Sequence, residues 1–438
     1  MIPRSVLQKK ETLDEINGEL NCGLKYSDDI SCLKENVLID GKMIPNRIVY
    51  QPMEGCDASP DGSPGELTER RYLRFASGGA GIIWFEAVSC LPEGRANPRQ
   101  LMLNDENIDK YKILLEKIRE TAIKENGCAP LIIMQNTHSG RYSRPNGVPE
   151  PVIAYNNELF EKDKPIDRSR IISDEGLDRV KESLVKNSVL AEKAGFDGVD
   201  VKCCHRYLNS ELLSAYEREG RYGGSFENRT RLLRESVEGS MQSVSKGFIV
   251  SSRLNVYDGF PYPYGFGVRR DGSSEFDKTE PVKLIKELEM LGVKIIDITM
   301  GNPYFNPHVN RPFAIGPYVP EEHPAAGVAR MLNGITEIHR DVPSVKVISS
   351  GLSWLGTLAP NIAAAYIKDG GFDFAGFGRM SLAYPDLAKD IIEKGALDKK
   401  KICLACSKCT ELMRSPGGTP GCVVKDPLYT KLYRQLKE

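Results

Sequence analysis

Short apolar runs alternate with longer amphipathic stretches along most of this chain. The apolar runs hold five to seven residues and are rich in Ile, Val and Phe, as in the buried strands of a parallel sheet. Eight predicted strands span residues 47–51, 81–86, 131–135, 198–202, 248–253, 294–300, 345–350 and 372–378. Helical periodicity marks residues 66–77, 106–125, 175–194, 229–244, 281–292, 325–340, 359–370 and 384–395. Eight strand–helix units are the number that closes a parallel barrel, so the pattern predicts an α/β fold, an eight-stranded (β/α)8 TIM barrel.

An open, doubly wound sheet is the alternative, because it also alternates strands with helices. Many such sheets carry a G-x-G-x-x-G turn after a strand, and no predicted strand here is followed by one. The pattern therefore favours the closed barrel.

The regular alternation occupies only part of the chain, which suggests three segments. We predict an N-terminal extension at 1–36, the barrel at 37–396 and a cysteine-rich C-terminal segment at 397–438. A long polar connection, 136–170, follows the third predicted strand. Loops of that length usually cover a site or bind a substrate.

Composition narrows the classes of partner. The chain has 59 Lys and Arg against 60 Asp and Glu, so it lacks the basic excess of a nucleic-acid-binding protein. No apolar run reaches the roughly 18 to 20 residues of a membrane-spanning helix, and the N-terminus shows no apolar core of a secretory signal. Eleven cysteines without such a signal indicate reduced thiols. We expect a cytoplasmic protein that binds neither nucleic acid nor membrane.

The residues at the carboxyl ends of the predicted strands are polar, and in TIM barrels these ends form the active site. Ser350 and Gly351 follow the seventh strand, and Gly378 and Arg379 follow the eighth. Glycines there let backbone N–H groups approach a phosphate, and the loops after strands seven and eight are a frequent phosphate site. This placement predicts a phosphorylated cofactor or substrate.

Gln135 ends the third predicted strand and Arg253 ends the fifth. An amide that both donates and accepts, beside a fixed positive charge, suits the edge of a flavin ring. Gln135 alone could cap a loop, and Arg253 alone could belong to a salt bridge of the barrel. Their joint position favours a cofactor site.

Several motifs together resemble the Old Yellow Enzyme family of FMN-dependent ene-reductases. They are NRIVYQPM, IMQNTHSGR, AGFDGVDV leading into CCHRYL, RYGGSFENRTR and GFGR, spread over about residues 36–395. The resemblance implies a barrel that holds FMN with one face open to substrate. It places Pro52 and Met53 against the flavin, Gln135 at its pyrimidine edge and Arg253 near its N1–C2 carbonyl region.

The same resemblance assigns roles around the substrate and the phosphate. Gly351, Gly378 and Arg379 would hold the phosphate, Tyr207 would be the proton donor, and Lys202 with His205 would orient the substrate. This chain departs from the family at three positions. Lys202 stands where His or Asn is usual, Glu54 stands beside the flavin where many members have Thr or Cys, and Arg206 replaces a common Gly, which we expect to narrow the site.

Four cysteines cluster in the C-terminal segment. Cys403, Cys406 and Cys409 follow C-x2-C-x2-C, and twelve residues separate Cys409 from Cys422. Three thiolates on a tight turn and a fourth from a nearby loop can surround a [4Fe-4S] cluster, as in ferredoxins. A structural zinc site is the alternative, although zinc sites favour two separated C-x2-C pairs. The cluster resembles that of the iron-sulfur branch of the family, where the third ligand commonly comes one residue later.

Together with these features, the resemblance implies an FMN- and [4Fe-4S]-dependent enzyme that reduces a C=C bond conjugated to a carbonyl. Three other hypotheses stay open: an amine or C–H dehydrogenase similar to trimethylamine dehydrogenase, a flavin-free barrel with zinc, and an electron-transfer subunit. Iron-sulfur relatives often continue into FAD and nucleotide-binding modules, whereas this sequence runs sixteen residues past Cys422. We expect NAD(P)H, or a separate electron-transfer protein or flavin subunit, to be the donor, and we expect a homo-oligomer.

Overall fold

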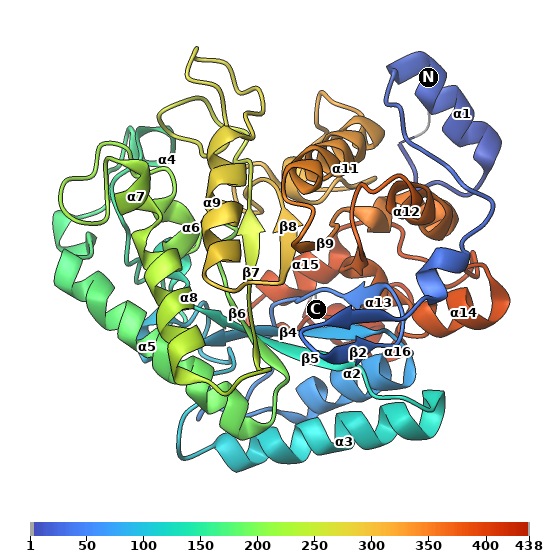
Figure 1. Cartoon of the computed structure of the whole chain (residues 1–438), viewed down its shortest axis with the longest axis horizontal. Coiled ribbons are helices and arrows are strands. Elements are labelled where there is room, and N and C mark those ends of the chain that lie inside the picture. The colour runs from blue at the N-terminus through green and yellow to red at the C-terminus, as the bar shows by residue number, and fades with distance from the viewer. Residues whose placement is uncertain (1–3, 437–438) are drawn as a thin grey trace.

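A ring of eight parallel strands forms the centre of the molecule, with helices around it (Figure 1). The computed structural model describes residues 4–436. Neighbouring strands follow the order β10-β3-β4-β5-β6-β7-β8-β9, and a parallel bridge between Ile348 and Phe374 joins the two ends of this order. The barrel strands are β3 (Ile48–Tyr50), β4 (Ile82–Ser89), β5 (Leu131–Thr137), β6 (Gly198–Val201), β7 (Ile249–Asn255), β8 (Ile295–Thr299), β9 (Lys346–Ile348) and β10 (Ala375–Phe377).

Each barrel strand is followed by one of the helices that the sequence predicts. These are α2 (Glu66–Ser77), α3 (Ile108–Asn126), α5 (Asp174–Ala194), α8 (Arg231–Ser243), α9 (Thr279–Met290), α11 (Pro324–Asp341), α12 (Ala359–Lys368) and α14 (Leu387–Lys394). The helix α5 shows why the chain turns where it does. Its N-terminus is capped by the Ser173 hydroxyl, and Gly195 takes the left-handed conformation that ends it, with φ 96°. The predicted TIM barrel is thus confirmed.

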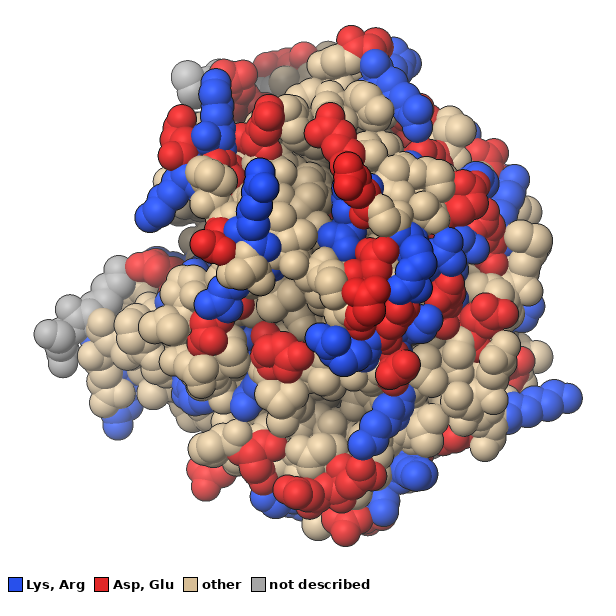
Figure 2. Space-filling view, turned by 90° about the vertical axis from the view of Figure 1, so that its left-hand side faces the viewer, with Lys and Arg blue, Asp and Glu red and all other residues tan. Residues whose placement is uncertain are grey.

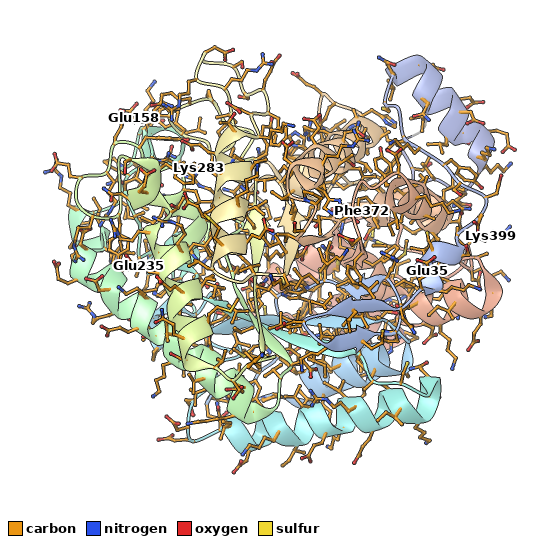
Figure 3. The ribbon with its side chains drawn as sticks, in the orientation of Figure 1. Glu35, Glu158, Glu235, Lys283, Phe372 and Lys399 are labelled. Carbon is orange, nitrogen blue, oxygen red and sulfur yellow. The ribbon has the colours of Figure 1, made fainter. Side chains whose placement is uncertain are left out.

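The barrel helices turn charged residues outward and apolar residues inward. On α8 and α9, Glu235 accepts from Lys181 at 2.8 Å and Lys283 donates to Glu227 at 2.8 Å, both on the outer surface (Figure 3). Phe372, which precedes β10, is buried and stacks on Tyr366 with ring centroids 5.8 Å apart. This amphipathic pattern is the reason that the helices pack around the strands.

A short antiparallel hairpin closes the amino-terminal end of the barrel. It consists of β1 (Val37–Ile39) and β2 (Lys42–Ile44), which the sequence analysis did not predict. Ile39 and Ile44 are buried in one apolar cluster with Trp84 and Ile133 from the barrel strands. We call this apolar cluster the apolar plug. Because side chains alternate along a strand, the next inward position on β5 after Ile133 is Gln135, so a layer of polar residues lies between the plug and the carboxyl ends of the strands.

The remaining elements lie in the connections and at both ends. They are α1 (Lys10–Leu20), η1 (Ser31–Lys34), η2 (Pro92–Gly94), η3 (Gly140–Tyr142), α4 (Glu158–Glu161), η4 (Arg168–Arg170), α6 (Leu208–Leu212), α7 (Phe226–Arg229), α10 (Pro307–Asn310), η5 (Leu352–Leu358), α13 (Arg379–Ala383), α15 (Lys408–Arg414) and α16 (Pro427–Gln435). The N-terminal extension packs against η5, where Leu7 exchanges backbone hydrogen bonds with Trp354 and Thr357. The C-terminal segment is tied to α2 through Asp426, which accepts from Arg70 and Arg74. Within residues 4–436, no helix is both long and apolar enough to cross a membrane.

Candidate active site

A cavity opens at the carboxyl ends of the strands, and its lining includes every catalytic and cofactor-binding residue that the sequence predicts. It encloses about 1020 Å³ of empty space, including its mouth. The predicted residues on its wall are Pro52, Met53, Glu54, Gln135, Lys202, His205, Tyr207, Arg253, Ser350, Gly351, Gly378 and Arg379. Residues from the carboxyl ends of six barrel strands therefore meet in one space, although their chemical roles remain predictions.

Two buried carboxylates beneath the cavity hold Gln135 and Arg253 in place. Asp200 accepts from the Gln135 amide at 2.7 Å and from the Arg253 backbone N–H at 2.6 Å. Asp297 lies 3.1 Å from Arg253 Nε and accepts from Gln51 at 2.8 Å. Burial raises the pKa of Asp297 to about 7, and the charge of Arg253 opposes this shift. The layer fixes which edges of the amide and the guanidinium face the cavity.

Sequence reasoning missed Asp200, Asp297 and Gln51. A signal was present, since Asp200 lies two positions before Lys202 and Asp297 lies two positions after Ile295, so the period of a strand turns each inward. Within the long apolar runs, however, such residues resemble isolated polar interruptions. Only the closed ring shows that they face one another.

The loop after β6 brings the predicted substrate-binding residues together. His205 and Arg206 both have positive φ, 64° and 56°, a conformation that non-glycine residues rarely adopt. The turn ends at Tyr207, which precedes α6. Lys202 Nζ lies 3.7 Å from the centroid of the Tyr207 ring. Backbone strain of this kind occurs where surrounding contacts fix a functional loop.

The hydroxyl of Tyr207 takes part in a polar chain at the cavity wall. It donates to a Glu54 carboxylate oxygen and lies 3.0 Å from the Tyr304 hydroxyl. Burial raises the pKa of Tyr207 well above its ordinary value. Burial also lowers the pKa of His205, with the nearby Arg253 and Lys202 charges adding to the effect, so the ring is neutral near pH 7. A neutral phenol and a neutral imidazole are both hydrogen-bond donors toward a substrate oxygen.

Arg206 does not narrow the cavity, contrary to the sequence-based expectation. Its side chain is fully buried away from the cavity, 3.1 Å from Asp258 and 3.2 Å from the Tyr155 hydroxyl. The positive φ of Arg206 turns its side chain to the opposite side of the loop from Tyr207. Its ion pair anchors the strained turn instead.

A second end of the cavity is positively charged. Arg379 Nη2 donates to the Pro312 carbonyl at 2.8 Å, while its buried Nη1 has no partner in the described chain. Arg311, which sequence reasoning missed, also lines this end and donates to Thr410 at 3.0 Å. Burial and the charge of Arg379 lower the pKa of Arg311 to about 10. Two arginines without an ion pair among residues 4–436, beside Gly351 with φ 88°, fit a bound phosphate.

His138 lies outside the cavity lining. It is buried, packs against Gly94 and accepts the Gly140 N–H at 3.1 Å. Burial lowers its pKa to about 4. Its contacts are those of a structural residue.

The four predicted cluster ligands line one small hollow, which also borders Arg379. They are Cys403, Cys406, Cys409 and Cys422. Ala405 and Ser407 between them have φ 48° and 59°, which turns successive cysteines toward the same side. No group of three or more His, Cys, Asp or Glu in residues 4–436 is assembled closely enough to hold a metal ion. The four thiols thus share one space without forming a closed coordination site, and Cys409 lines the main cavity as well.

Comparisons with known proteins identify the family to which this chain belongs. The sequence profile described as "NADH:flavin oxidoreductase / NADH oxidase family" matches residues 37–398. The chain is similar to the NADPH dehydrogenase of Halalkalibacterium halodurans, at 29% identity over 61% of this chain and 73% of that protein. It is similar to the NADH oxidase of Thermoanaerobacter brockii, at 27% identity over 84% of this chain and 52% of that protein.

A solved complex of 2-naphthoyl-CoA reductase with 2-naphthoyl-CoA has the same fold. Its TM-score is 0.73 at 20% identity, over 92% of this chain and 58% of that one. The chain thus spans little more than half the length of two of these three proteins. The resemblance noted in the motifs is confirmed: the chain is an enzyme that belongs to the NADH:flavin oxidoreductase / NADH oxidase family of flavin-dependent oxidoreductases.

Proposed function

We propose that this protein is an FMN- and [4Fe-4S]-dependent ene-reductase acting on a C=C bond conjugated to a carbonyl. The convergence of Lys202, His205 and Tyr207 over the cavity that Gln135 and Arg253 border is the observation that carries the proposal. The residues fit FMN in three zones. Pro52 and Met53 offer a surface for the ring, Gln135 and Arg253 offer polar contacts to its edge, and the opposite end carries Arg311 and Arg379.

The chain's own residues would act on the carbonyl and the α carbon. Lys202 Nζ and His205 would donate to the carbonyl oxygen and stabilise the negative charge that develops there. Tyr207 would pass its hydroxyl proton to the α carbon, which a phenol does only once that carbon carries charge. FMN, when bound, supplies the hydride to the β carbon.

The charge of the cavity favours this reaction over amine dehydrogenation. Lys202, Arg253, Arg311 and Arg414 border the cavity, and Glu54 is the one acid on its wall within residues 4–436. A cationic amine would meet like charges, whereas a developing enolate would be stabilised.

The four cysteines would hold the iron-sulfur cluster. Thiolate ligands from a C-x2-C-x2-C turn and a separate loop are the set that such clusters require. The test is an iron and acid-labile sulfide assay on the Cys422→Ala variant, which should lose both. Cys128→Ala, a change of an exposed cysteine, is the control and should keep them. Zinc without iron in the unaltered protein would exclude the cluster.

We further propose a cytoplasmic homo-oligomer. Its electrons would come from NAD(P)H at the open face of the cavity, or from a separate redox protein, and its substrate would be a small unsaturated carbonyl compound.

The experiment on the reaction uses the flavin-loaded protein under anaerobic conditions. Tyr207→Phe should slow reoxidation of the reduced enzyme by an enone or enoyl thioester by about 10²- to 10⁴-fold, the range for loss of a general acid. Tyr257→Phe is the matched control, because its hydroxyl donates to the Ser274 carbonyl outside the cavity. Full turnover by Tyr207→Phe would refute the assigned proton donor.

A further inference from the structure

A second hollow adjoins the flavin cavity and continues from it toward the surface. The two spaces share Glu54, Tyr304, Met413 and Arg414 on their walls. The outer hollow encloses about 1480 Å³ of empty space, including its opening. A substrate whose reactive end lies in the flavin cavity can therefore extend its other end into the outer hollow.

Three arginines from three separate parts of the chain line this outer hollow. Arg99 lies in the connection after β4, Arg144 in the connection after β5, and Arg414 at the end of α15. Arg414 belongs to the C-terminal segment, and Arg99 donates to the Gly418 carbonyl of the same segment. The three arginines therefore come together because this segment folds back over the barrel.

These arginines have no carboxylate partner in the described chain. Arg414 lies over the Tyr304 ring at 4.9 Å and donates to the Pro303 carbonyl at 3.2 Å, and Arg144 makes no side-chain hydrogen bond. Glu54 is the one acid among the described residues that line the hollow, and the Tyr207 hydroxyl already donates to it at the inner end. Three guanidinium groups therefore line this hollow without an ion pair among the described residues, and one acid accompanies them.

Several arginines on other surfaces of the molecule are paired with carboxylates, whereas others, including Arg168 and Arg179, are exposed and have no ion pair among the described residues. Arg221 lies 2.7 Å from Asp178, and Arg340 lies 3.0 Å from Asp369. The outer hollow differs in that three arginines without such a pair, from separate parts of the chain, line one space. On the face shown in Figure 2, basic and acidic side chains are interspersed. Since the whole chain has a net charge of -1, the unpaired arginines reflect local placement rather than a basic protein.

We propose that the outer hollow binds an anionic group at the remote end of the substrate. This inference rests on the proposed function for the position of the C=C bond, and it narrows the substrate class to unsaturated carbonyl compounds with a distant negative charge. Guanidinium groups bind phosphate and carboxylate through paired N–H donors, so the phosphates of an acyl-coenzyme A and a terminal carboxylate share the required chemistry.

The kinetic test compares substrates that differ only in the remote group. One pair is crotonyl-coenzyme A and crotonyl-N-acetylcysteamine, and the other is 10-oxodec-8-enoic acid and dec-2-enal. The unaltered enzyme should prefer the charged member of at least one pair, and that pair identifies the phosphate or the carboxylate as the bound group. Arg144→Gln should raise KM for that member about tenfold, leaving kcat and the uncharged member nearly unchanged. Arg414→Gln, which also alters the wall of the flavin cavity, should raise KM for the charged member about tenfold more than for its uncharged counterpart. Arg340→Gln is the control. No preference in either pair, or an equal loss for both members, would overturn the proposal.

A binding measurement separates this inference from the ene-reductase proposal. Calorimetric titration of the flavin-loaded protein with coenzyme A, and separately with azelate, requires no turnover. Arg144→Gln and Arg414→Gln should weaken the Kd of one of these ligands about tenfold, and added salt should weaken it in the unaltered protein. If that result appears while no C=C substrate is reduced, the anion site stands and the proposed reaction fails. If neither ligand binds, or both variants bind as the unaltered protein does, the anion site is refuted.

Discussion

Asp200 and Asp297 show how single residues set the geometry of the site without lining it. Each is fully buried inside the barrel and accepts hydrogen bonds from side chains or backbone on neighbouring strands. A buried carboxylate is costly unless it is paired, and Arg253 supplies the positive charge between the two. The arginine that borders the cavity is therefore held from below, which pre-organises it for a negative charge above.

His138 provides a residue-scale prediction about pH. Its pKa is about 4 in the folded protein, against an ordinary value near 6.5. Between these values the unfolded chain binds a proton that the folded protein does not, so the free energy of unfolding falls as the pH is lowered from 6.5 to 4. Over this pH range the free energy of unfolding falls by about 3 kcal/mol through the His138 ring. His138→Asn, which retains an acceptor for the Gly140 N–H, should lose this part of the pH dependence in urea unfolding. Parallel pH profiles for the two proteins would contradict the assignment.

At the scale of elements, the β1–β2 hairpin performs a structural task that is separate from the site. Ile44 is fully buried in the apolar plug, whereas Met43 on the same strand is 60% exposed. Truncating a buried Ile leaves a cavity, so Ile44→Ala should lower the free energy of unfolding by about 2–4 kcal/mol. Met43→Ala, the control, should change it by less than about 0.5 kcal/mol.

Chemical denaturation measures both hairpin variants, and flavin titration adds a second readout. The polar layer of Gln51, Gln135, Asp200 and Asp297 separates the plug from the cavity, so the Kd for FMN should stay unchanged in Ile44→Ala below the denaturation range. A weakened FMN affinity in that variant would show that the two ends of the barrel are coupled.

The elements also show what a sequence pattern reveals and what it does not. The barrel strands appear as continuous apolar runs and the barrel helices as long periodic patterns, so all eight of each were predictable. The three-residue strands of the hairpin are too short to show a period of two. The α15 and α16 helices are short, and in their segment the spacing of the cysteines guided the prediction rather than a helical period. Residues just after the strands were predictable because the barrel fixes where strand ends lie. Arg311 was not, because it caps the short helix α10 in a long connection whose path depends on tertiary contacts.

At the scale of the whole molecule, the C-terminal segment completes the wall of the flavin cavity. Met413, Arg414 and Pro420 line that cavity although they lie far from the barrel strands in the sequence. Asp426, with a side chain that is 3% exposed, fastens the segment by its ion pairs to Arg70 and Arg74 of α2. FMN binding should therefore depend on an ion-pair cluster outside the site.

Asp426→Asn tests this dependence. Asparagine preserves the N-cap of α16, where Asp426 accepts the Leu428 N–H at 3.1 Å, but removes the charge that holds both arginines. The loss of charge-assisted bonds should cost about 1–3 kcal/mol of local stability. Limited proteolysis should then cut faster within residues 415–418, and the Kd for FMN should rise several-fold. Asp398→Asn, on the exposed start of the same segment, is the control and should change neither quantity. If the segment opens in Asp426→Asn while FMN affinity is unchanged, the barrel alone holds the flavin and the segment serves only the cysteines and the outer hollow.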